Sequence, residues 1–129
     1  MNIINALYVL IMFFMFCIGT CSAQEVINQS NFKDKIAKDI VVVEFWAEWN
    51  KANEFAELNK LKDSSVYRVD IMHCSKLQAD YKISAVPTVV VFDNGVEKER
   101  FNANIMFQLE ADKKTIQTSI DTIILNKFQ

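Results

Sequence analysis

Residues 40–53 read IVVVEFWAEWNKAN, and this stretch decides the fold of the chain. Its first half, Ile40–Trp46, is almost continuously apolar, which is typical of a central parallel strand covered on both faces. Asn50 follows this run and is a residue type that often caps a helix N-terminus. The spacing of apolar residues over Ala52–Lys62 predicts a helix. Its predicted buried residues are Phe55, Leu58 and Leu61.

The chain on the N-terminal side of this stretch predicts one short strand and one helix. Glu25–Ile27 is the candidate strand, and Ser30 is a plausible N-cap for the helix that follows. Four apolar residues share one face of that helix at helical spacing. These are Phe32, Ile36, Ala37 and Ile40.

Strands and helices alternate after the opening stretch. Val66–Ile71 and Thr88–Phe92 are predicted core strands, with a short helix over Ser75–Lys82 between them. The Asn94-Gly95 dipeptide predicts a tight hairpin to a last strand over Val96–Phe101. This order predicts an α/β protein with a central mixed sheet flanked by helices on both faces.

The end of the chain predicts a final helix. Asp112 is the candidate cap of this helix, and its apolar stripe is Ile116, Ile120, Ile123 and Ile124. Residues 102–111 alternate weakly, and two interpretations remain open for them. They either extend the preceding hairpin or lie over the sheet.

The N-terminal segment differs in composition from the rest of the chain. Residues 1–23 contain no Asp, Glu, Lys or Arg, and an unbroken apolar run spans Ala6–Ile18. This run is typical of a signal peptide, and cleavage after Ala23 is our first expectation. The alternatives are a lipoprotein signal with a lipid on Cys21, and a retained membrane anchor. Each predicts that a single domain, residues 24–129, is periplasmic, secreted or membrane-anchored.

Charge and cysteine content exclude several kinds of site. The formal net charge is −2 without a basic patch, which argues against a nucleic-acid partner. Only Cys74 lies in residues 24–129, so this region has no internal disulfide. His73 and Cys74 fall short of the four ligands of a structural zinc site, and we expect neither a metal nor a cofactor.

Two stretches resemble the thioredoxin family. Val43–Asn53 is similar to the family's active-site segment, usually V-D-F-W-A-E-W-C-G-P-C, and Ile83–Thr88 with the following Val89–Gly95 is similar to its cis-proline strand and hairpin. Val69–Ile71 matches the strand between them. The resemblance covers residues 25–101 and the last helix. It implies a thioredoxin fold and a cis peptide bond before Pro87.

The departures from the family pattern carry the functional prediction. Asn50 and Asn53 stand where the family has its two cysteines. Thiol–disulfide exchange needs an attacking thiolate and a resolving thiol, and asparagine is neither. Glu44 takes the place of the family's buried acid, and Arg68 takes the place of a nearby lysine. We therefore expect a Glu44–Arg68 ion pair and no dithiol–disulfide oxidoreductase activity.

The resemblance also implies which surface binds a partner. The family holds extended peptides along its cis-proline edge, so the candidate binding residues are Trp49, Val86, Pro87 and Thr88. A short segment after Asn53 predicts an open groove beside Trp49. The leading hypothesis is a protein- or peptide-binding module, not an enzyme. The alternatives are a single-cysteine redox protein that uses Cys74 in cell redox homeostasis, and a structural envelope protein held by its N-terminus.

Overall fold

The computed structural model describes residue 3 and residues 25–129. The predicted signal or anchor segment, including Cys21 and the cleavage site after Ala23, lies outside the described residues except for Ile3. Among the helices that are described, none is long and apolar enough to span a membrane.

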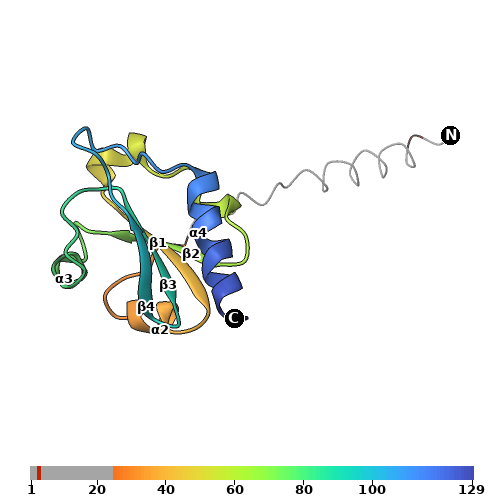
Figure 1. Ribbon diagram of the computed structural model, residues 1–129. Helices are drawn as coiled ribbons and strands as arrows, with labels where there is room; N and C mark the ends of the chain where they lie inside the picture. The colour runs from red at the N-terminus through yellow and green to blue at the C-terminus, as the bar shows by residue number, and fades with distance from the viewer. Residues whose placement is uncertain (1–2, 4–24) are drawn as a thin grey trace.

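A four-stranded mixed sheet forms the centre of the domain (Figure 1). Its strands are β1 (Ile40–Trp46), β2 (Ser65–Asp70), β3 (Thr88–Asp93) and β4 (Val96–Phe101), in the order β2-β1-β3-β4. β1 runs parallel to β2 and antiparallel to β3, and β4 is antiparallel to β3. The predicted first strand is reduced to a single bridge between Val26 and Arg68 at the edge of β2.

Helices cover both faces of the sheet, which confirms the predicted fold class. The helices α2 (Phe32–Ile36) and α3 (Ser75–Asp80) pack on one face, and α4 (Lys113–Asn126) packs on the other (Figure 1). Side chains along a strand point alternately to the two faces, so β1 supplies both cores. Val41, Val43 and Phe45 join the core under α2 and α3, whereas Ile40 and Val42 join the core under α4.

The structure bears out some predicted helix caps and contradicts others. The Asp112 side chain accepts a hydrogen bond from the Thr115 N–H at 2.8 Å and caps α4 as predicted. The prediction of Ser30 as a cap is wrong, because Asn31 occupies the N-cap position of α2 and makes no side-chain cap bond. The Ser30 hydroxyl and N–H both donate to the Asn28 side chain instead.

The predicted helix over Ala52–Lys62 is wrong. Two short 3₁₀ turns, η1 (Glu48–Asn53) and η2 (Leu58–Lys60), occupy this segment, with extended backbone at Glu54 between them. The Phe55 N–H donates to the Glu44 carboxylate at 2.6 Å instead of bonding to the helical partner four residues back. The predicted burial of Phe55, Leu58 and Leu61 is nevertheless confirmed.

Residues 103–109 form a small hairpin of their own after β4, which we call the 103–109 hairpin. Ala103 and Leu109 make an antiparallel bridge, and the Asn104 N–H donates to the Gln108 carbonyl at 2.9 Å. The Asn104 side-chain oxygen accepts the N–H groups of Met106 and Gln108. The Asn104 side chain therefore stabilises the turn of the hairpin by accepting hydrogen bonds from two of its backbone N–H groups.

Candidate functional site

Strand direction brings four connecting segments to one edge of the sheet. β1, β2 and β4 end at this edge and β3 begins there, because β3 is antiparallel to its neighbours and β1 is parallel to β2. The segments are residues 47–53, 71–74, 83–87 and the 103–109 hairpin. Figure 1 shows the blue hairpin beside the gold η1 turn at this edge. Residues distant in sequence therefore meet around Asn50.

The Asn50 side chain joins three of these segments. Its amide nitrogen donates to the carbonyl of Val86 at 2.9 Å and to the carbonyl of Phe107 at 3.0 Å. Its amide oxygen accepts a hydrogen bond from the Asn53 amide at 2.8 Å. Both amide hydrogens and the amide oxygen are thus used within the protein.

The prediction that Asn50 caps a helix is wrong. Asn50 lies at a kink inside η1, with φ −113° and ψ 22°, and its oxygen accepts from a side chain and not from a backbone N–H. Its amide faces the loop before β3, where the Val86–Pro87 peptide bond is cis. The side chain therefore serves as a link between loops.

The candidate binding residues differ in accessibility. The side chains of Val86, Pro87 and Thr88 are buried, and the Thr88 hydroxyl donates to the Ala85 carbonyl at 2.7 Å. Trp49 is 59% exposed, and its ring meets the ring of Phe107 edge to face, with 5.4 Å between centroids. Of the four residues, only Trp49 offers its side chain to a ligand.

Glu44 and Arg68 form a buried ion pair. Glu44 is fully buried, and its carboxylate accepts from Arg68 Nε at 2.7 Å and from the Phe55 N–H at 2.6 Å. Arg68 also donates to the Phe55 carbonyl at 3.0 Å and lies 3.6 Å from Glu54. Burial raises the pKa of Glu44 above its ordinary 4.5, while the bonds from Phe55 and Arg68 oppose this rise. The pair fixes the backbone just after Asn53, which is a structural role.

The structure separates the environments of His73 and Cys74. Cys74 is a free cysteine, 4% exposed, in the core under α2 and α3. His73 is exposed and lies 3.7 Å from the Asp70 carboxylate. Across the part of the chain that the structure describes, no group of three or more His, Cys, Asp or Glu residues could hold a metal ion.

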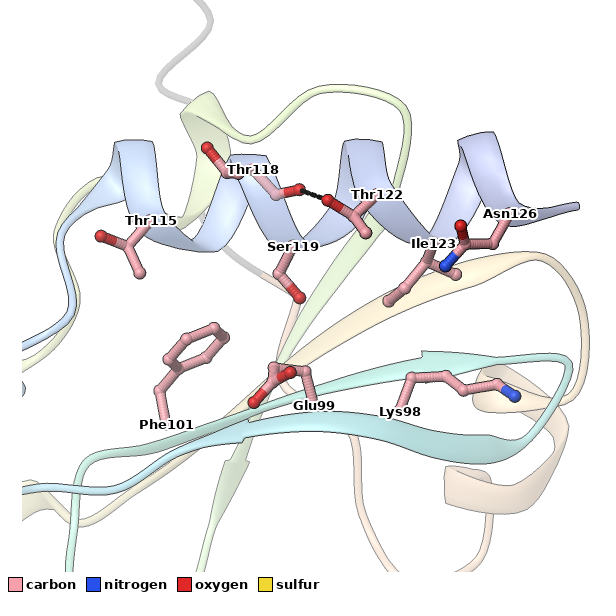
Figure 2. Close-up of a pocket in the computed structure, with 9 residues that line it drawn as sticks. All are labelled: Lys98, Glu99, Phe101, Thr115, Thr118, Ser119, Thr122, Ile123 and Asn126. Carbon is pink, nitrogen blue, oxygen red and sulfur yellow. Dashed lines mark hydrogen bonds between the residues drawn. The ribbon is translucent and has the colours of Figure 1, made fainter.

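A groove lies between α4 and β4 (Figure 2). Glu99 and Phe101 of β4 face Ser119 of α4 across it. The hydroxyls of Thr118 and Thr122 donate to carbonyls one turn back in α4. Because these hydroxyls already donate to the helix backbone, their hydrogens are not available to a ligand in the groove.

Phe107 is a site residue that the sequence reading missed. It reaches Asn50 through its carbonyl and Trp49 through its ring. The available signal was the run of three apolar residues, Ile105-Met106-Phe107, between Asn104 and Gln108. A signal of that kind marks an exposed apolar turn, but it does not show which surface the turn contacts.

The fold is that of a thioredoxin-like protein, and its candidate site contains the side-chain amides of Asn50 and Asn53. The model of the thioredoxin family matches residues 23–120, and the chain belongs to this family. It is 32% identical over 82 residues to a thioredoxin of Chlamydia trachomatis, covering 59% of this chain and 80% of the relative. A thioredoxin of Mycoplasma genitalium is 37% identical over 70 residues, covering 50% and 69%. The solved thioredoxin of Malassezia sympodialis superposes with a TM-score of 0.61 at 26% identity, over 78% of this chain and 90% of that structure.

Proposed function

We propose that this chain is an exported member of the thioredoxin family that binds a protein or peptide partner and does not exchange disulfides. The observation that carries this proposal is the bonding of Asn50. An amide that links three segments of the site has no sulfur to attack a disulfide, and its partner Asn53 has none to resolve one. The thioredoxin fold around Asn50 and Asn53 is retained, so we propose that the domain functions in recognition of a partner.

The binding surface is the region around Trp49 and the Val86–Pro87 loop. An exposed tryptophan is a frequent anchor of protein interfaces, because it offers a large apolar area with a polar tip. Val86–Thr88 contribute through their backbone, since their side chains are buried. We propose export because the apolar segment Ala6–Ile18 is typical of a signal peptide. An exported domain would function in the periplasm or outside the cell.

Burial of Cys74 argues against a single-cysteine redox protein. A thiol must reach a disulfide sulfur to attack it, and the Cys74 side chain is enclosed by core residues. We therefore propose that Cys74 is a packing residue.

A disulfide-reduction assay tests the proposal. Reduction of insulin by dithiothreitol is followed for the full-length wild type, for Asn50→Cys/Asn53→Cys and for the matched control Asn50→Ser/Asn53→Ser. We expect the wild type and the serine control to add nothing to the uncatalysed rate, and the double-cysteine variant to accelerate it. Catalysis by the wild type contradicts the proposal, and its loss in Cys74→Ser would then identify that thiol as the source.

A further inference from the structure

The outer edge of β4 is open. Among the residues that the structure describes, β4 pairs only with β3, and it stands at the end of the strand order β2-β1-β3-β4. Residues 96–99 of the strand are exposed, and residues 100 and 101 are partly buried. An open strand edge presents backbone N–H and C=O groups that can pair with a further strand.

The sequence of β4 is complementary to itself. It reads Val-Glu-Lys-Glu-Arg-Phe, with an apolar residue at each end and charges of alternating sign between them. We consider a second copy of β4 that lies antiparallel to the first, with the centre of the pair between Lys98 and Glu99. Opposite charges across antiparallel strands stabilise the pairing. The residues that then face each other are Val96 and Phe101, Glu97 and Arg100, and Lys98 and Glu99.

A β-bulge at Lys98 makes this register possible. In a regular strand Lys98 and Glu99 would point to opposite faces of the sheet, so they could not meet across a symmetric pair of strands. In β4, however, Val91 of β3 pairs with Glu99, and the next residue of β3 pairs with Glu97. Lys98 is the extra residue of this bulge. Lys98 and Glu99 consequently both line the groove beside α4 (Figure 2).

The other two kinds of pair also lie on matching faces. Glu97 and Arg100 pair with β3 residues of the core under α2 and α3, and their side chains contact each other at 2.7 Å. Phe101 packs in the core under α4, and Val96 pairs with Asp93, whose carboxylate contacts the end of α4. A two-fold axis perpendicular to the sheet keeps each face on its own side. All the complementary contacts can therefore form together.

Charge disfavours the neighbouring registers. A shift of one residue in one direction places Lys98 opposite its own copy and sets Glu97 against Glu99. A shift in the other direction places Glu99 opposite its own copy and sets Lys98 against Arg100. Like charges that face each other destabilise the pairing of strands. The charges thus oppose pairing in these registers, and a two-fold pair uses both open β4 edges and closes as a dimer.

We propose that two copies of this chain pair antiparallel along β4, so that their four-stranded sheets become one continuous sheet. Lys98 of each copy faces Glu99 of the other at the centre of the interface. Each Arg100 is shared between its own Glu97 and the partner's Glu97. This inference does not rest on the proposed function, because no residue of β4 belongs to the site around Asn50.

The dimer dissociation constant of the full chain tests the inference. It is measured by sedimentation velocity over a concentration series up to about 1 mM. Lys98→Glu and Glu99→Lys each place like charges at the centre of the interface and leave the Glu97–Arg100 pair in place. We expect each to raise the dissociation constant at least about tenfold, since two attractive contacts become repulsive. Lys76→Glu is the matched control, because it makes the same charge change at an exposed residue of α3 and should alter nothing.

A mixture of the two β4 variants distinguishes pairing along β4 from other modes of association. In a heterodimer of Lys98→Glu with Glu99→Lys, each introduced charge faces a charge of opposite sign. We expect the equimolar mixture to associate about as tightly as the wild type, although each variant alone is weakened. Association through the apolar segment Ala6–Ile18 would be the same in all these samples.

Amide hydrogen exchange locates the contact. We expect exchange in β4 to slow as the protein concentration rises, and exchange in β2, the strand at the other end of the sheet, to stay constant. Lys98 and Glu99 are exposed, so far-UV circular dichroism should show both variants folded. Three results would overturn the inference: a chain that stays monomeric to about 1 mM, a dissociation constant that neither β4 variant changes, and a mixture no tighter than its components.

Discussion

Replacing Arg68 with methionine should leave a buried carboxylate without its cation. Methionine keeps much of the length of the arginine stem and removes the guanidinium group. The Glu44 side chain then retains only the bond from the Phe55 N–H, and the Phe55 carbonyl loses its Arg68 donor. The perturbation therefore acts on the pair that fixes the segment after Asn53.

The burial of Glu44 sets the magnitude of the effect. Removing one partner of a buried ion pair costs about 3–5 kcal/mol, because the remaining charge stays in a low-dielectric site. Glu44 is fully buried and the Arg68 side chain is 13% exposed, so this range applies here. Adding Glu44→Gln to Arg68→Met removes the stranded charge, and we expect the double variant to be more stable than Arg68→Met alone.

Urea unfolding followed by far-UV circular dichroism measures these differences. Arg100→Met is the matched control, because Arg100 pairs with Glu97 at 2.7 Å on the more open strand β4. An ion pair of that kind contributes about 0–1 kcal/mol. We therefore expect a clear separation between the two arginine variants at pH 7.

The pH dependence of Arg68→Met has a definite sign. Loss of the guanidinium raises the pKa of Glu44 further above its ordinary 4.5, since burial then acts with less opposition. The folded state then binds a proton more readily than the unfolded state, so stability rises as the pH falls from 7 towards 4.5. The deficit relative to the wild type should shrink over this interval. A loss no larger than that of Arg100→Met, or a deficit that grows towards acid pH, would refute the reasoning.

Three further predictions concern the core, the last helix and the hairpin. Phe32→Ala should lower the free energy of unfolding by about 3–5 kcal/mol, measured by urea titration, because the ring is fully buried among three other aromatic rings. Asp112→Ala should destabilise the protein above pH 5 and become neutral in acid, since the bond from the Thr115 N–H lowers the pKa of Asp112 below 3.8 and its benefit is lost on protonation. Thermal unfolding at both pH values checks this sign. Asn50→Asp should speed amide hydrogen exchange in the 103–109 hairpin, because a carboxylate cannot donate to two carbonyls. Asn53→Ala is its control and should leave the hairpin protected, so equal exchange in both variants would count against Asn50 as the link.

Local sequence signals predicted the sheet well. The apolar run over Ile40–Trp46, the Asn94-Gly95 turn and the Asp112 cap each depend on neighbours in the chain, and each lies where it was predicted. The resemblance to the thioredoxin family, and no local signal, implied that Glu44 and Arg68 would pair, and the structure contains this pair. Their strands are adjacent and parallel, and the two residues lie directly opposite each other in the register.

The segment after Asn50 shows where local reasoning failed. The apolar spacing of Phe55, Leu58 and Leu61 has the period of a helix, and all three are buried. The backbone nevertheless takes up two 3₁₀ turns, because a side chain from β1 receives the Phe55 N–H. A helix propensity of a few tenths of a kcal/mol per residue yields to a hydrogen bond with a buried charge.

The sequence by itself determined the family, the alternation of strands and helices, and the presence of asparagine at positions 50 and 53, because each depends on residue type and short-range spacing. Only the tertiary structure decided what Asn50 does and where the 103–109 hairpin lies. Both depend on contacts between residues that are 36 and 57 positions apart in the chain. Such contacts arise when strand direction brings distant loops to one edge of the sheet, and no local pattern in the sequence encodes that meeting.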